Sequence, residues 1–139
     1  MREVTKQMIK RYLINKLGYD FMGYQFQDQK ELSFHHLIVP KRLCPLKGYG
    51  DGYYQWNGAI LVQNTAHNYL HIIERYDRDM FEAITKQMIK ENRNGKIDVE
   101  QLQAIDDILR QFEKQYSGLR TRKEKPLIRE EYTKRLIKR

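Results

Sequence analysis

The stretch that decides the fold runs from residue 33 to residue 77 and reads SFHHLIVPKRLCPLKGYGDGYYQWNGAILVQNTAHNYLHIIERYD. It contains all four histidines of the 139-residue chain, in two close pairs. The first pair is His35 and His36, and the second is His67 and His71, with three residues between them. A loop rich in Gly and Tyr, a short apolar run and a helix-start signal separate the pairs. The histidines therefore bracket a turn, a strand and a helix.

The residues around the second pair predict a helix. A short apolar strand is followed by Asn64, whose side chain is a plausible N-cap for a helix over 65–76. On this helix His67, His71 and Glu74 fall at positions i, i+4 and i+7, which share one face. Two imidazoles are therefore presented together, with a carboxylate one turn further on.

The first pair lies on a predicted strand. Residues 19–26 are rich in aromatic side chains, and residues 31–39 are apolar and β-prone. This pattern predicts a hairpin that carries His35 and His36 on its second strand. Pro40 cannot donate a hydrogen bond to a sheet, so we expect the strand to end there.

The loop over 41–56 connects the two pairs and contains too many glycines and prolines for a regular element. Loops of this length in compact domains are usually functional or disordered, but the aromatic content of this one predicts an ordered loop that packs over the histidine stretch. A base-stacking platform is the alternative role for these rings. The aromatic residues are Tyr49, Tyr53, Tyr54 and Trp56.

The rest of the chain predicts helices. Apolar residues recur at helical spacing over 5–17, and Asp77 and Asp98 are the expected N-caps of two later helices. The composition then changes, because residues 118–139 hold nine Lys or Arg against three Glu. The sequence predicts a single α+β domain over 1–117, with an N-terminal helix and two or three C-terminal helices, followed by a basic tail or short helix.

Composition and charge limit the class of protein. No apolar run approaches the ~18 residues that a membrane span needs, and no signal-peptide core is present, so we expect a cytoplasmic protein without a membrane partner. Cys44 is the only cysteine, so a bound metal would need His and carboxylate ligands. The net charge of +8 makes a polyanion the first partner to consider.

Four histidines in this arrangement suit the hydrolysis of a phosphodiester. That reaction needs a general base for the attacking water and a cation beside the scissile phosphate. A helix with His67 and His71 supplies two ligands for the cation, and a nearby strand can supply a third ligand and the base. An asparagine at the start of a strand, such as Asn57, can fix the loop that bears the base through its side-chain amide.

The order of these residues resembles the HNH nuclease family with its ββα-metal motif, over about residues 33–77. The doubled histidine pairs are most similar to the colicin DNase branch. The resemblance implies that His36 is the general base, that Asn57 orients it, and that His35, His67 and His71 hold the metal.

The same resemblance implies one divalent ion, Mg, Mn, Ni or Zn, and cutting or nicking of DNA, with double-stranded DNA the expected partner and RNA an alternative. Glu74 would lie just outside the metal ligands. The residues expected to contact nucleic acid are Lys41, Arg42, Arg120, Arg122 and Lys123.

The sequence leaves three points open. Pro40 lies four residues after His36, where the family often has three, and neighbouring strand residues point to opposite faces. Which of His35 and His36 is the ligand and which the base is therefore undecided.

The alternative function is a non-catalytic module for nucleic acid or protein, which keeps the ββα frame with a structural zinc or no metal. The oligomeric state is also open.

Overall fold

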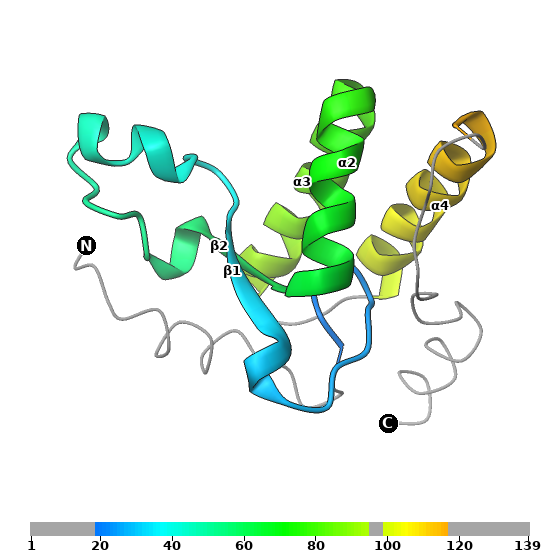
Figure 1. Cartoon of the computed structure of the whole chain (residues 1–139), viewed down its shortest axis with the longest axis horizontal. Coiled ribbons are helices and arrows are strands. Elements are labelled where there is room, and N and C mark those ends of the chain that lie inside the picture. Colours follow the sequence, from blue (N-terminus) through cyan, green and yellow to red (C-terminus); the bar gives the residue numbers. More distant parts are fainter. Residues whose placement is uncertain (1–18, 95–98, 117–139) are drawn as a thin grey trace.

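The computed structural model describes residues 19–94 and 99–116 (Figure 1). The predicted helix over 5–17, the N-cap Asp98 and the tail over 118–139 lie outside the described residues. The strands and helices are β1 (Leu32–His36), β2 (Gly58–Val62), α2 (Asn68–Tyr76), α3 (Arg78–Asn94) and α4 (Val99–Gln115). A two-stranded antiparallel sheet with helices beside it confirms the α+β class.

The sheet pairs β1 with β2 and not with the aromatic segment over 19–26, so the predicted hairpin is wrong. That segment forms only an isolated bridge between Tyr19 and Gln25. The reason is the buried Asp20, whose Oδ1 accepts hydrogen bonds from the backbone N–H groups of Met22 and Tyr24, each at 2.8 Å. These bonds curl the segment on itself and leave β1 to find its partner 22 residues further along the chain.

β1 ends at His36, four residues earlier than Pro40 would require. The side chain of Asn57 explains the difference. Its Oδ1 accepts the backbone N–H groups of Ile38 and Val39, at 3.0 and 2.7 Å, so neither group is available to extend the ladder. The side-chain amide of Asn57 therefore takes the place of a neighbouring strand as the hydrogen-bond partner of these two residues.

The connection from β2 to α2 is a wide, π-type helical turn over Gln63–His67. Asn64 is exposed within this turn and does not cap α2, so the predicted N-cap is wrong. The predicted cap at Asp77 is confirmed, because its Oδ1 accepts the N–H of Met80 at 3.1 Å at the start of α3.

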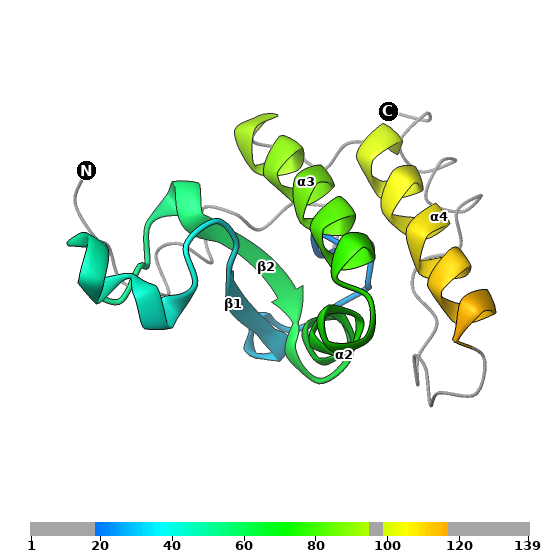
Figure 2. The ribbon, with the colours of Figure 1, turned by 90° about the horizontal axis from the view of Figure 1, so that it is seen from above.

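The core lies between the sheet and the three helices, and α3 and α4 run side by side (Figure 2). The apolar side chains that recur at helical spacing in α2, α3 and α4 are buried or partly buried in this core, which removes them from water and stabilises the fold. The largest fully buried side chains are Tyr19, Leu32, Ile60, Leu61, Leu70, Ile73, Ile84, Met88, Ile105, Leu109 and Phe112.

Residues 40–57, here called the arm, project from the end of the sheet on the side opposite α4 (Figure 1). The arm contains its own ring cluster: Tyr54 stacks on Trp56 with ring centroids 5.6 Å apart, and Tyr49 meets Trp56 edge-on at 5.3 Å. These three rings pack on one another, whereas Tyr53 packs against Phe34 and His36 of β1, as predicted for a loop that packs over the histidine stretch.

Candidate metal centre

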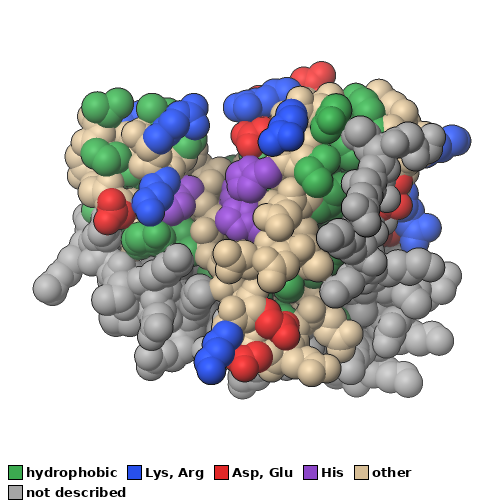
Figure 3. Space-filling view, in the orientation of Figure 1, with side chains coloured by type: hydrophobic (Ala, Val, Ile, Leu, Met, Phe, Trp, Pro, Cys, Tyr) green, Lys and Arg blue, Asp and Glu red, His purple; other side chains and the backbone are tan. Residues whose placement is uncertain are grey.

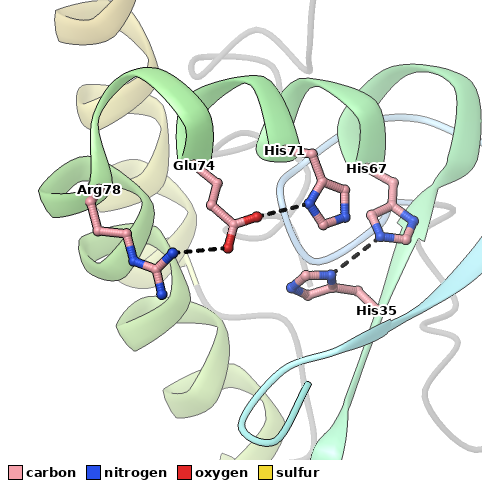
Figure 4. Close-up of polar contacts among 5 residues, drawn as sticks. All are labelled: His35, His67, His71, Glu74 and Arg78. Atoms are coloured by element: carbon pink, nitrogen blue, oxygen red, sulfur yellow. Dashed lines mark hydrogen bonds and ion pairs between the residues drawn. The ribbon is translucent and has the colours of Figure 1, made fainter. Parts of the chain in front are cut away.

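Three of the four histidines meet where β1 crosses the start of α2 (Figure 4). His35 comes from β1, and His67 and His71 come from the π-type turn and α2. Their candidate ligand nitrogens all lie within 4.8 Å of one another, an arrangement that could hold a metal ion. His35 is buried, His67 is partly buried and His71 is exposed, so the cluster opens to solvent on one side.

The local structure explains why these rings meet. His67 and His71 are four residues apart on continuous helical backbone, which brings their ring centroids to 4.8 Å. Alternation along β1 points His35 toward the same helix, with its ring centroid 5.1 Å from that of His67. The shared helix face of the second pair, predicted from spacing alone, is thus present in the structure.

The protonation of His35 suits a metal ligand. Burial lowers the pKa of His35 to about 3, and the neighbouring imidazoles of His67 and His71 add to this shift. The ring is therefore neutral at pH 7, and a neutral imidazole offers a nitrogen lone pair.

The distances also suit an ion. Nδ1 of His35 and Nε2 of His67 lie 3.3 Å apart. Two nitrogens bound tetrahedrally at about 2.0–2.1 Å from zinc are themselves separated by about 3.3 Å. Three imidazoles leave at least one coordination position open, as in catalytic rather than structural zinc sites. The residues present therefore fit a single divalent ion.

Glu74 contacts the cluster from one turn further along α2. Its Oε1 lies 3.1 Å from Nδ1 of His71, and its Oε2 lies 3.3 Å from a guanidinium nitrogen of Arg78 (Figure 4). A carboxylate that accepts the Nδ1 proton directs Nε2 of the ring toward a metal. Glu74 thus lies beside His71 on the face that the helical spacing predicted.

His36 does not join the cluster. Its side chain lies on the opposite face of β1, where the ring meets Phe34 and Tyr53 with centroids 5.0 and 5.1 Å away. Nε2 of His36 lies 2.7 Å from the backbone carbonyl oxygen of Asp51 in the arm. The geometry separates the two adjacent histidines and groups His35 with the helix pair.

Asn57, the last residue of the arm, is fully buried. Besides accepting two amides through Oδ1, its Nδ2 donates to the carbonyl oxygens of Val39 at 3.1 Å and Gly52 at 3.2 Å. Gly52 follows Asp51, whose carbonyl contacts His36. Asn57 therefore connects both ends of the arm close to the point where the arm contacts the His36 ring.

An open cleft of about 850 Å³ lies between the arm and α2 and α3, and both His36 and the three-histidine cluster line it. Figure 3 shows histidines in this hollow, with Lys and Arg side chains on both sides. The cationic lining residues are Lys41 and Arg42 from the arm and Arg78 and Lys86 from α3. Of the residues predicted to contact nucleic acid, Arg120, Arg122 and Lys123 lie outside the described residues.

Sequence reasoning missed two side chains that support the site. Ser33 lies two residues before His35 on the same face of β1, and its Oγ is 2.7 Å from Nδ1 of His67. The two-residue period of a strand is a signal that could have found it. Asn92 of α3 donates to the carbonyl oxygens of Gln55 and Gly58 and braces the turn around Asn57. No local pattern points to Asn92, because its partners lie more than 30 residues away.

Comparisons with protein-family models, with curated proteins and with solved structures found no match for this chain. Within the described ranges, no helix has both the length and the apolar character needed to cross a membrane. The site must therefore be interpreted from its own geometry.

Proposed function

We propose that this chain is a metal-dependent endonuclease that hydrolyses phosphodiester bonds in DNA. The observation that carries the proposal is the separation of the first histidine pair. His35 joins His67 and His71, whereas His36 lies on the other face of β1, and all four rings line one cleft. Hydrolysis of a phosphodiester needs these two groups side by side: a set of metal ligands and an independent base. The chain order of these residues resembles the HNH family.

In the proposed mechanism His36 is the general base. A carbonyl oxygen only accepts hydrogen bonds, so the contact with Asp51 fixes the proton of the neutral ring on Nε2. Nδ1 then carries the lone pair and removes a proton from the attacking water. The buried amide of Asn57 holds Gly52, next to Asp51, and so keeps the ring in position.

His35, His67 and His71 are the proposed ligands of one divalent ion. When bound, the ion would stabilise the negative charge that develops on the phosphate oxygens. Imidazole nitrogens suit zinc and nickel better than magnesium, which prefers oxygen ligands. Within the set expected from the sequence, we therefore favour zinc or nickel as the tightest binder.

The cations on the two walls of the cleft support a polyanionic substrate. Lys41 extends over the ring of Tyr53 at 5.7 Å from its centroid, on the same side as His36. Lys86 lines the opposite wall. We propose that the DNA backbone crosses between these walls. Contacts of this kind give affinity that falls with salt and little sequence preference.

The direct test is nicking of supercoiled plasmid DNA by purified protein with Zn²⁺, Ni²⁺, Mn²⁺ or Mg²⁺, with a chelator control. We expect ion-dependent nicking that chelator abolishes. His36→Ala should lower the rate by at least about 100-fold, in the range for loss of a general base, while the protein still binds the ion. Gln63→Ala, which alters an exposed residue of the same cleft, is the matched control and should nick at the parental rate.

Other outcomes would redirect the proposal. Retention of zinc without cleavage under any ion would favour the non-catalytic module. Metal-dependent loss of RNA with intact plasmid would make RNA the substrate. Parental cleavage by His36→Ala would remove His36 from the role of base.

A further inference from the structure

Ser33 makes a buried contact to the metal centre that the proposed function does not use. It lies on β1, on the same face as His35, and its side chain bridges β2 and the π-type turn. The hydroxyl oxygen is 3.0 Å from the carbonyl oxygen of Leu61 and 2.7 Å from Nδ1 of His67. A single hydroxyl thus connects the sheet to one of the three clustered histidines.

The donor and the acceptor in each of these two hydrogen bonds can be assigned by counting the hydrogens available. A serine hydroxyl has one hydrogen, and a carbonyl oxygen can only accept. Ser33 therefore donates to Leu61, since otherwise two acceptor oxygens would face each other at 3.0 Å. The short contact with His67 then requires Nδ1 of the imidazole to donate to Ser33. The neutral His67 ring consequently carries its proton on Nδ1 and has a lone pair on Nε2.

With this assignment, His67 and His71 carry their proton on the same ring nitrogen. Nε2 of His67 lies 3.3 Å from Nδ1 of His35, on the inner side of the cluster. His71 has its Nδ1 beside the carboxylate of Glu74, which accepts that proton in the same way. Each ring thus has its Nδ1 proton held by a neighbouring oxygen, one from β1 and one from α2, and Nε2 left as the basic nitrogen (Figure 4).

We propose that Ser33 is a positioning residue of the metal centre: its hydroxyl holds the Nδ1 proton of His67 and thereby keeps Nε2 of that ring unprotonated for an ion. The inference rests on the metal centre of the proposed function and is independent of DNA cleavage. Partners of metal-bound histidines in other proteins contribute about 10- to 100-fold to metal affinity. The hydroxyl, rather than the size of the side chain, is the feature that matters.

The first test is titration of the metal-free protein with Zn²⁺ or Ni²⁺ alone, in competition with a chelating dye. Ser33→Ala should weaken binding about 10- to 100-fold, whereas Ser33→Thr, which keeps the hydroxyl and suits a strand, should restore it to within about threefold. The matched control is Thr65→Val, since Thr65 lies in the same turn and its hydroxyl has no hydrogen-bond partner among the described residues. Equal affinities for Ser33→Ala and Thr65→Val would overturn the proposal, as would failure of the parental protein to bind either ion.

The second test observes the proton itself. Nitrogen-15 NMR of the imidazoles in the metal-free protein should find the His67 proton on Nδ1 in the parental chain and in Ser33→Thr. Ser33→Ala should release the ring to the Nε2-protonated form. A parental His67 protonated on Nε2 would overturn the proposal, and so would an unchanged tautomer in a folded Ser33→Ala protein. Because neither test measures cleavage, each result can be separated from the plasmid assay.

Discussion

The two faces of β1 hold their histidines in different ways. On the helix face, formed by Ser33 and His35, the imidazole of His67 is held by two side chains of β1, the hydroxyl of Ser33 and the ring of His35. On the arm face, formed by Phe34 and His36, the ring is held by a backbone carbonyl of a long loop. The helix face is built from regular elements, whereas the arm face depends on a loop being fixed in place.

The difference predicts that the two faces can be damaged separately. Changes to the arm should impair the proposed base and leave the ion site intact, because no ligand comes from residues 40–57. Changes to the helix face should do the reverse.

Asn57→Ala should have the largest effect. The substitution removes the acceptor of the Ile38 and Val39 amides, while the carbonyl oxygen of Gly52 keeps its bond from the N–H of Tyr54. At about 1–3 kcal/mol for each amide left unsatisfied, the free energy of unfolding should fall by at least about 2 kcal/mol. Urea unfolding measures this loss.

The matched control is Asn64→Ala, the same change at an exposed position of the turn, which should alter stability by less than about 0.5 kcal/mol. Where Asn57→Ala folds, its affinity for zinc should stay within about threefold of parental while nicking falls by at least about 100-fold. Parental stability in Asn57→Ala would mean that the arm is held by other contacts.

Gly52→Ala should also damage the arm face. Gly52 has φ +79°, and a methyl group there would collide with Sγ of Cys44 and come within 3.0 Å of the His36 ring. Gly48 has the same φ of +79°, but a methyl group there meets nothing within 4 Å. Both substitutions incur the left-handed backbone cost of about 1–2 kcal/mol, and Gly52→Ala should add about 1–3 kcal/mol from crowding.

Thermal unfolding and plasmid nicking of the two alanine variants separate backbone strain from displacement of the ring. Nicking should fall in Gly52→Ala and stay near parental in Gly48→Ala. Equal losses in both variants would attribute the effect to backbone strain alone.

The helix face should show its own pH dependence in the metal-free protein. The pKa of His35 is lowered from 6.5 to about 3, so the folded state prefers the neutral ring and its stabilising contribution is lost as the pH falls below the unfolded pKa. Linkage predicts a loss of about 2 kcal/mol between pH 7 and pH 5.

Urea unfolding at each pH with chelator present, for the parental chain and for His35→Leu, isolates this contribution as a difference. The parental chain should lose stability faster than His35→Leu as the medium becomes acidic. Parallel curves for the two proteins would show that His35 is not held neutral by burial.

The sequence predicted the helix face better than the arm face, for a physical reason. The spacing of His67, His71 and Glu74 fixes their relation because a helix has a constant period. The apolar stripes of α2, α3 and α4 follow from the same regularity. Local periodicity could therefore predict where two of the three clustered imidazoles meet.

Local periodicity could not predict that β1 pairs with β2. A strand pattern predicts that a segment is extended, but it does not predict which strand pairs with it. Here the side chain of Asp20 accepts hydrogen bonds from the backbone of residues 22 and 24, so residues 19–25 fold into a turn and do not pair with β1. The separation of His35 from His36 depended likewise on contacts across the fold, with His67 on one face and Asp51 on the other. Such contacts between distant residues leave no periodic trace in a single sequence.

The smallest predicted effect tests whether the two walls of the cleft act together on DNA. Lys41 lies on the arm wall and Lys86 on the α3 wall, and each has an exposed lysine nearby that does not line the cleft, Lys47 and Lys90. Lys41→Ala and Lys86→Ala should each weaken DNA binding about 2- to 10-fold at low salt and lower the slope of log affinity against log salt by about 0.9, the value for one lost phosphate contact.

Fluorescence anisotropy with a labelled duplex, across a salt series, gives both quantities for the four single variants. Lys47→Ala and Lys90→Ala should bind within about twofold of the parental chain. A loss confined to Lys41→Ala would place the DNA on the arm face alone, and a loss confined to Lys86→Ala would place it on the helix side. Equal losses at both lysines would support a DNA backbone that crosses the cleft between His36 and the proposed metal ligands, as the proposed function predicts.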